Sequence, residues 1–121
     1  MKSITVEPLT PEAFAPFGTV IEADPATAVE INSGYTTRFH ALATAETGDG
    51  DAILSIFRGR PRDLSVAMLE RHPLGSQAFV PLGGQPWLAV VAETPSQDAC
   101  RAFLCQGHRS EEHTSELQSP M

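Results

Sequence analysis

Basic residues are scarce in this chain of 121 residues. Eight Lys and Arg stand against fifteen Asp and Glu, so the formal net charge is −7 when histidine is neutral. Nucleic-acid phosphates bind to basic surfaces, and we therefore expect no nucleic-acid partner. Long apolar runs are also lacking: none approaches the roughly 20 residues that span a bilayer, so we expect no membrane partner.

Cysteine is almost as rare. Cys100 and Cys105 are the two cysteines of the chain. Their spacing matches neither a disulfide framework nor a Cys-x-x-Cys pair, and the N-terminal residues lack the apolar segment of a secretory signal. We therefore expect reduced thiols and a cytoplasmic protein.

Proline and glycine, by contrast, are frequent. Ten Pro and nine Gly predict many turns, which favours short strands over long helices. The hydrophobic fraction of 41% is enough for a core, and the length fits one domain at most. These features predict a mainly β domain, either a barrel or a sandwich.

Alternation of apolar and polar residues locates the expected strands. They cover residues 4–9, 19–22, 29–32, 36–41, 52–58, 66–72, 77–82 and 87–92. Thr10-Pro11-Glu12 predicts the start of a short helix, because Thr caps, Pro fits the first turn and Glu complements the helix dipole. We also expect a helix over 98–104 and a hairpin turn at Gly83-Gly84.

A short polar stretch carries the strongest candidates for chemistry. Glu70 and His72 are two residues apart, so in a strand their side chains point to the same side. Gln77 follows a turn at 73–75 and can return near them. A His with a carboxylate suits a divalent metal or a proton-transfer site. The alternative is a solvated strand face with an ordinary surface ion pair.

Four other polar residues are further candidates. Arg58 ends an apolar strand, where a guanidinium either grips a carboxylate with two hydrogen bonds or reaches solvent. Arg71 alternates away from His72. His40 suits either a pocket lining or a structural position, and Asn32 precedes a Ser-Gly turn.

The last residues, 109–121, differ from the rest of the chain. They are polar and show no period of 2 or 3.6, so we expect a disordered tail. Residues 109–119 also look like the in-frame translation of a common sequencing-library adapter, which would make the tail non-native. We therefore divide the chain into a β domain over 1–108 and a tail over 109–121.

The chain resembles the ureidoglycolate lyase family, formerly called ureidoglycolate hydrolase, over nearly all of residues 1–108. The most specific motif is Glu-Arg-His-Pro-Leu-Gly-Ser-Gln-Ala-Phe at 70–79. Shorter matches follow in the family's order at 6–14, 18–22, 31–34, 38–40, 55–58 and 101–104. Several short matches in the right order are a stronger signal than one alone.

This resemblance implies a cupin-like β-barrel with short peripheral helices, usually forming a homodimer. It implies a carbon–nitrogen lyase (an amidine-lyase) that cleaves ureidoglycolate, a small-molecule substrate, to glyoxylate and urea in allantoin and purine catabolism. It implies no organic cofactor but a divalent metal, nickel in some members, for which His72 is the candidate ligand. We expect catalytic roles for His72, Gln77 and Glu70, and substrate-binding roles for Arg58, Arg71, Asn32 and His40.

Two departures from the family pattern bear on activity. Ala41 stands where the family usually has Asp. A second family motif, Asn-Tyr-x-Arg-x-x-Trp-His-His-Pro, and the strands after it do not occur in this chain. We therefore expect an incomplete barrel whose closing strands are missing, and a 121-residue fragment that is inactive and poorly soluble. The alternative function is a non-catalytic cupin-like module that binds a small molecule or a metal, or that dimerises.

Overall fold

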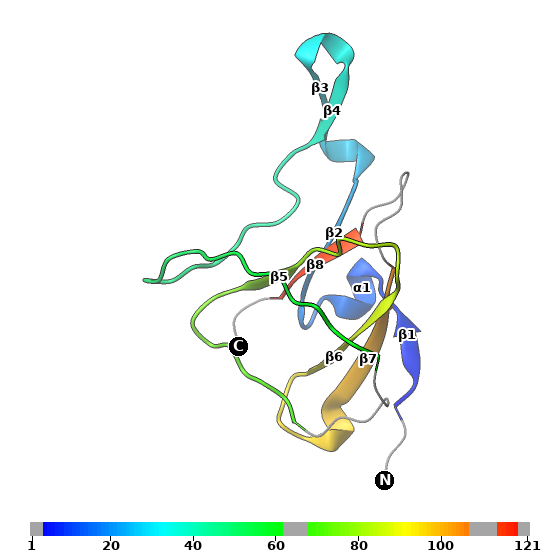
Figure 1. The fold of residues 1–121 in the computed structure, drawn as a ribbon, viewed down its shortest axis with the longest axis vertical. Helices are drawn as coiled ribbons and strands as arrows, with labels where there is room; N and C mark the ends of the chain where they lie inside the picture. The colour runs from blue at the N-terminus through cyan, green and yellow to red at the C-terminus, as the bar shows by residue number, and fades with distance from the viewer. Residues whose placement is uncertain (1–3, 62–67, 107–113, 119–121) are drawn as a thin grey trace.

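The computed structural model describes residues 4–61, 68–106 and 114–118, and within them the fold is mainly β, as expected (Figure 1). One short α-helix and three 3₁₀ turns accompany the strands. The elements are β1 (Val6–Pro8), α1 (Pro11–Phe14), β2 (Gly18–Glu22), η1 (Pro25–Thr27), β3 (Ala28–Ile31), η2 (Asn32–Gly34), β4 (Thr36–Phe39), β5 (Gln77–Phe79), β6 (Trp87–Ala92), η3 (Gln97–Ala99), β7 (Cys100–Cys105) and β8 (Thr114–Gln118).

The described strands form three small sheets that do not close into a barrel. In the first sheet β7 lies between β1, which runs parallel to it, and β6, which runs antiparallel. In the second sheet β8 lies between β2 and β5, antiparallel to both. The third sheet is the hairpin β3–β4. The open edges agree with the incomplete barrel that the sequence predicts.

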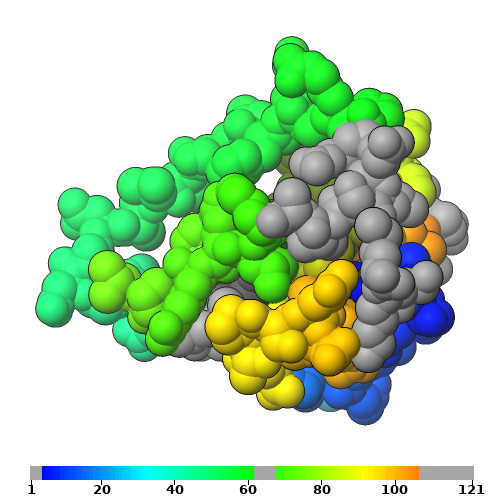
Figure 2. All heavy atoms as spheres, turned by 90° about the horizontal axis from the view of Figure 1, so that it is seen from below, coloured from blue at the N-terminus to red at the C-terminus, as the bar shows by residue number. Residues whose placement is uncertain are grey.

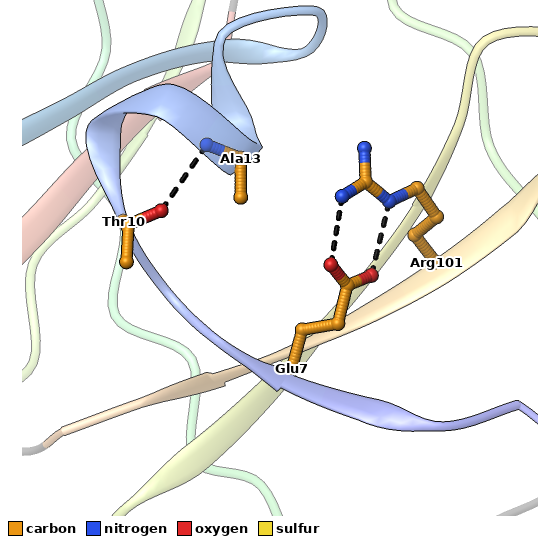
Figure 3. Close-up of polar contacts among 4 residues, drawn as sticks. All are labelled: Glu7, Thr10, Ala13 and Arg101. Carbon is orange, nitrogen blue, oxygen red and sulfur yellow. Dashed lines mark hydrogen bonds and ion pairs between the residues drawn. The ribbon is translucent and has the colours of Figure 1, made fainter.

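Helix α1 begins as its sequence predicts. Thr10 is the N-cap, and its hydroxyl accepts a hydrogen bond from the backbone N–H of Ala13 at 3.1 Å (Figure 3). Pro11 occupies the first turn, where no intrahelical N–H bond is lost. The helix is short, but it carries Phe14 into the core with no exposed surface.

Four apolar side chains form the core of the described structure. Phe14, Phe17, Val20 and Phe103 pack together, from α1, the turn after it, β2 and β7. The rings of Phe14 and Phe103 meet edge to face, with centroids 5.3 Å apart and planes at 83°, a favourable arrangement for two aromatic quadrupoles. This cluster joins the two larger sheets to α1.

An ion pair joins the neighbouring strands β1 and β7 (Figure 3). The Arg101 guanidinium donates two hydrogen bonds to the Glu7 carboxylate, from Nε at 3.0 Å and from Nη2 at 2.7 Å. The same guanidinium lies 5.1 Å from the ring centroid of Phe103. These hydrogen bonds lower the pKa of the Glu7 carboxyl and raise the pKa of Arg101.

The hairpin β3–β4 stands clear of the other sheets (Figure 1). All residues of both strands are exposed. The turn between them contains Asn32 and Ser33 at φ 53° and 58°, followed by Gly34 at 86°, so the expected turn is confirmed. After the hairpin, Ala41 also has a positive φ, 52°. Asp tolerates this left-handed conformation better than Ala does, which gives a physical reason for the family's usual residue there.

Three expectations about secondary structure are wrong. The residues 52–58 and 68–72 are in no strand, because no described strand hydrogen-bonds to them; 66 and 67 lie outside the described residues. Gly83-Gly84 does not close a hairpin, since β5 pairs with β8 and β6 pairs with β7. The expected helix over 98–104 is instead η3 followed by β7, because β7 is hydrogen-bonded on both sides.

The polar tail contains a strand that the sequence does not predict. β8 pairs with Gly18–Glu22 on one side and with Gln77–Phe79 on the other, so these five residues are not disordered here. A strand between two antiparallel neighbours satisfies both of its backbone edges, which local sequence cannot reveal. Whether the tail is native stays a prediction, and its other residues lie outside the described ones. Within the described residues, no helix is long and apolar enough to cross a bilayer.

Candidate functional site

Glu70 and His72 lie together, as their spacing predicts. Nε2 of His72 is 3.4 Å from Oε2 of Glu70, and the two side chains are 46% and 64% exposed, respectively. Neither residue lies in a described strand. A carboxylate this close can orient an imidazole. The pair can therefore accept and return a proton, and its exposure leaves it open to a solute.

Gln77 begins β5, and two hydrogen bonds to Glu46 fix the residue before it, Ser76. The backbone N–H of Ser76 donates to the carbonyl of Glu46 at 2.7 Å, and the Ser76 hydroxyl accepts from the N–H of Glu46 at 2.9 Å. These two bonds join loop 44–51 to the end of the polar stretch. Ser76 and Glu46 therefore set the position of Gln77, although nothing in their spacing of 30 residues signals this.

Two glycines allow the loops that carry Glu46 and Ser76 to approach each other closely. Gly48 has φ +57°, and a Cβ built on it would lie 2.8 Å from the carbonyl oxygen of Leu74. A Cβ on Gly75 would lie 3.0 Å from the carbonyl oxygen of Glu46. The two loops approach so closely that side chains at these positions would push them apart.

The two candidate arginines are differently placed. Arg58 is exposed at the end of the unpaired segment 51–61. Arg71 is exposed between Glu70 and His72 in sequence. Exposed guanidinium groups such as these can bind an anionic solute.

Asn32 and His40 lie on the projecting hairpin and its exit. The Asn32 amide donates to the Thr36 hydroxyl at 3.3 Å, and the His40 backbone N–H donates to the Thr27 carbonyl at 3.3 Å. These contacts stabilise the hairpin. Within the described part of the chain, no contact joins either residue to Glu70, His72 or Gln77, so their substrate-binding roles stay predictions.

The described residues do not fit a resident divalent metal. Glu70 and His72 offer two donors, and in residues 4–61, 68–106 and 114–118 no group of three or more His, Cys, Asp or Glu side chains comes together. Protein metal sites ordinarily use at least three protein ligands. The metal suggested by the resemblance therefore enters no step of the chemistry below.

A hollow at the surface lies elsewhere, beside the Glu7–Arg101 pair. It measures about 190 Å³ and is lined by Ile4, Thr5, Glu7, Gln97, Asp98, Cys100 and Arg101. Ligand sites for small molecules are usually larger, roughly 300–1,000 Å³. None of the seven candidate residues lines this hollow, and it is not a candidate active site.

Comparison with known proteins identifies the family. A family model described as ureidoglycolate lyase matches residues 1–114. A protein of Pseudomonas fluorescens named ureidoglycolate lyase is 54% identical over 116 residues, covering 90% of this chain and 70% of its own length. One from Rhizobium meliloti, ureidoglycolate lyase 1, is 62% identical over 112 residues, covering 88% of this chain and 66% of its own length. The chain thus spans about two thirds of the length of these relatives.

Proposed function

The chain belongs to the ureidoglycolate lyase family, and from this we propose that it is built for the cleavage of ureidoglycolate to glyoxylate and urea, a carbon–nitrogen lyase reaction of the amidine-lyase type. The observation that carries the proposal is the match over residues 1–114 together with identities above one half. The Glu70–His72 pair supports it, because the reaction is a proton transfer coupled to bond cleavage.

The reaction needs two proton movements. One carbon of ureidoglycolate carries a hydroxyl, a ureido nitrogen and a carboxylate. When the hydroxyl loses its proton, the oxygen's electron pair forms the carbonyl of glyoxylate and the carbon–nitrogen bond breaks. The leaving nitrogen gains a proton and departs as urea. A base that takes the first proton and returns one to nitrogen conserves all atoms without water.

The residues divide these tasks among them. His72 takes the hydroxyl proton and then donates it to the departing nitrogen, while Glu70, 3.4 Å away, orients the ring. Gln77, fixed through Ser76, orients the substrate by hydrogen bonds. Arg58 holds the carboxylate, with Arg71 as the second candidate.

The oligomeric state, the cellular location and the class of substrate belong to the same proposal. A homodimer, cytoplasmic location and small-molecule substrate follow from the resemblance of the chain to its family. The exposure of Arg58, Arg71, Asn32 and His40 means that these side chains do not line a closed pocket in this chain, which agrees with the inactive fragment expected from the sequence.

The test is an assay of the 121-residue chain with ureidoglycolate, with the Pseudomonas fluorescens relative as positive control. We expect saturable binding of ureidoglycolate to the 121-residue chain by calorimetry but no turnover above background, whereas the relative should release glyoxylate and urea in equal amounts. Any turnover that is detected should be abolished by His72→Ala and unchanged by Glu12→Ala, an exposed residue of α1 that serves as control. Release of ammonia in place of urea, or no binding of ureidoglycolate, would overturn the proposal.

A further inference from the structure

The position that β8 fills between β2 and β5 accommodates one extended chain (Figure 1). β8 is antiparallel to both neighbours, so β2 and β5 run parallel to each other on its two sides. Among the described residues, neither β2 nor β5 pairs with any other strand. The strand pairing of β2 and β5 therefore comes from the segment between them, and we call this position the strand site.

The β2 side of the strand site is anchored by the core. Val20 is 7% exposed and packs in one cluster with Phe14, Phe17 and Phe103. These partners come from α1, the turn after it, and β7. Figure 2 shows the blue N-terminal residues against the yellow and orange residues of β6 and β7. Burial of its side chain thus holds β2 in place in addition to the ladder with β8.

The β5 side has anchors of its own. Ser76, directly before β5, forms hydrogen bonds of 2.7 and 2.9 Å with Glu46. At the other end of the strand, the ring centroids of Phe79 and Trp87 are 6.0 Å apart, which connects β5 to β6. Neighbouring strands in a sheet lie about 4.8 Å apart, so β2 and β5 leave about 9.6 Å between them, the room for a single strand.

The backbone of the segment, rather than a matching sequence, holds it in the strand site. Residues 114–118 read Thr-Ser-Glu-Leu-Gln, with one β-branched residue and no aromatic one. Glu116 lies opposite Val20 in one ladder and opposite Phe79 in the other, although apolar residues are the favourable cross-strand partners of both. A segment that pairs in spite of this mismatch is held by its two ladders of backbone hydrogen bonds.

Addition of a strand through backbone hydrogen bonds is an ordinary way in which proteins bind extended peptides. We propose that the strand site binds an extended peptide from solution, and that an apolar residue at the position of Glu116 strengthens this binding. The partner is thus a peptide segment with an apolar central residue, polar neighbours and no proline at its centre. The proposal is independent of the lyase reaction, and its test uses no ureidoglycolate.

The first test uses the full 121-residue chain with Glu116→Pro, which removes an N–H from the chain's own β8 and so opens the strand site to a competitor. The probe is a fluorescently labelled peptide with the sequence of residues 111–121. By fluorescence anisotropy we expect saturable binding to the variant. The wild-type chain should bind about a hundredfold more weakly, because its tethered strand competes at a high effective concentration. A peptide that itself carries Glu116→Pro should not bind.

Two peptide variants test the register. Glu116→Val places a β-branched residue opposite Val20 and Phe79 and should tighten binding about fivefold. Gln118→Val is the matched control, because residue 118 lies opposite Gly18 and Gln77, and it should leave the affinity within about twofold. Equal effects of the two substitutions would overturn the proposal.

Cross-linking tests the strand site in a chain that keeps its own β8. Thr19 and Ala78 are exposed, lie on the two sides of the site, and are both opposite Leu117. In a Cys100→Ser background, Thr19→Cys and Ala78→Cys chains should each form a disulfide with an excess of the Leu117→Cys peptide. Opposed strand residues have Cα atoms about 4.5–5.5 Å apart, which suits a disulfide. The Glu116→Cys peptide, one residue out of register, should form little.

The cross-linking decides the proposal if Glu116→Pro unfolds the chain, which the fluorescence of Trp87, the single tryptophan, would show. Cross-linking of both Thr19→Cys and Ala78→Cys supports a peptide between β2 and β5. Cross-linking of one chain or neither, or equal reaction of the Glu116→Cys peptide, would overturn it. Disulfide-linked dimers of a Thr19→Cys/Leu117→Cys chain would assign the strand site to the tail of a second copy and would also overturn the proposal.

Discussion

Arg101 links strand β7 to residues that are far from it in the sequence. Its two hydrogen bonds to Glu7 span 94 residues of sequence, and its guanidinium lies near the rings of both Phe17 and Phe103. The bidentate geometry suits Arg and no other side chain. The pair is partly exposed, at 37% for Arg101 and 32% for Glu7, so its effect is more sensitive to pH and salt than that of a buried pair.

The Glu7 carboxyl should make stability depend on pH. Its pKa is lowered in the folded chain, chiefly by the hydrogen bond from Arg101, from the ordinary value of 4.5. A lowered folded pKa gives stabilisation that is complete above the unfolded pKa and is lost as pH falls through the folded pKa. We therefore expect the free energy of unfolding, measured by urea titration, to decrease below about pH 4.5 more steeply in wild type than in Glu7→Gln.

The matched control for this prediction is Glu22→Gln, an exposed glutamate at the end of β2. Glu22→Gln should alter the decrease in the free energy of unfolding at acid pH less than Glu7→Gln does. If Glu7→Gln and wild type had parallel curves between neutral and acid pH, the ion pair would contribute no pH dependence.

Among the elements, the ones that local signals define were predictable. α1 begins at Thr10 because cap, proline and glutamate occur together, and β6 (Trp87–Ala92) follows Pro86 as a short apolar run. β7 was not predictable, because its residues Cys100–Cys105 become a strand through pairing with β1, almost one hundred residues earlier. The 52–58 segment shows the converse: its local pattern is that of a strand, but the described chain supplies no neighbour.

The same contrast applies to the candidate site. The nearness of Glu70 and His72 follows from a spacing of two residues in an extended chain. The two hydrogen bonds between Glu46 and Ser76 require two loops to meet, and no local sequence pattern predicts that. The placement of Asn32 and His40 on a projecting hairpin depends likewise on how the hairpin leaves the sheets.

The cap of α1 gives a test at the scale of the element. Thr10→Ala removes the oxygen that accepts the Ala13 N–H and should cost about 1 kcal/mol of unfolding free energy. The loss should reach the whole fold, because α1 carries the fully buried Phe14. Thr10→Ser, which keeps the hydroxyl, is the control and should stay within a few tenths of a kcal/mol of wild type. Equal losses in both variants would mean that the methyl group, not the cap, matters.

At the scale of the whole molecule, the cluster of Phe14, Phe17, Val20 and Phe103 joins α1 to the two larger sheets. Phe103 touches the rings of Phe14 and Phe17, with centroids 5.3 and 6.0 Å away, and has no exposed surface. Many other large apolar side chains are exposed, including those of the projecting hairpin and of segment 51–61. The stability of the molecule therefore depends on few buried residues, and its exposed apolar residues are left for association.

Phe103→Ala tests this dependence. Loss of a fully buried ring typically costs about 3–5 kcal/mol, from the transfer of the ring and the cavity left behind, and a domain of this size has only about 5–15 kcal/mol in total. We expect the urea midpoint, followed by Trp87 fluorescence, to fall to low urea or the chain to be unfolded in buffer. Tyr35→Ala removes an equally large ring that is 91% exposed at the hairpin and should shift the midpoint little. A small effect of Phe103→Ala, comparable to that of Tyr35→Ala, would place the stabilising core outside this cluster.

Because Arg101 lies over the Phe103 ring, the Phe103→Ala variant should also weaken the Glu7–Arg101 pair. Its free energy of unfolding should then depend less on acid pH than that of wild type.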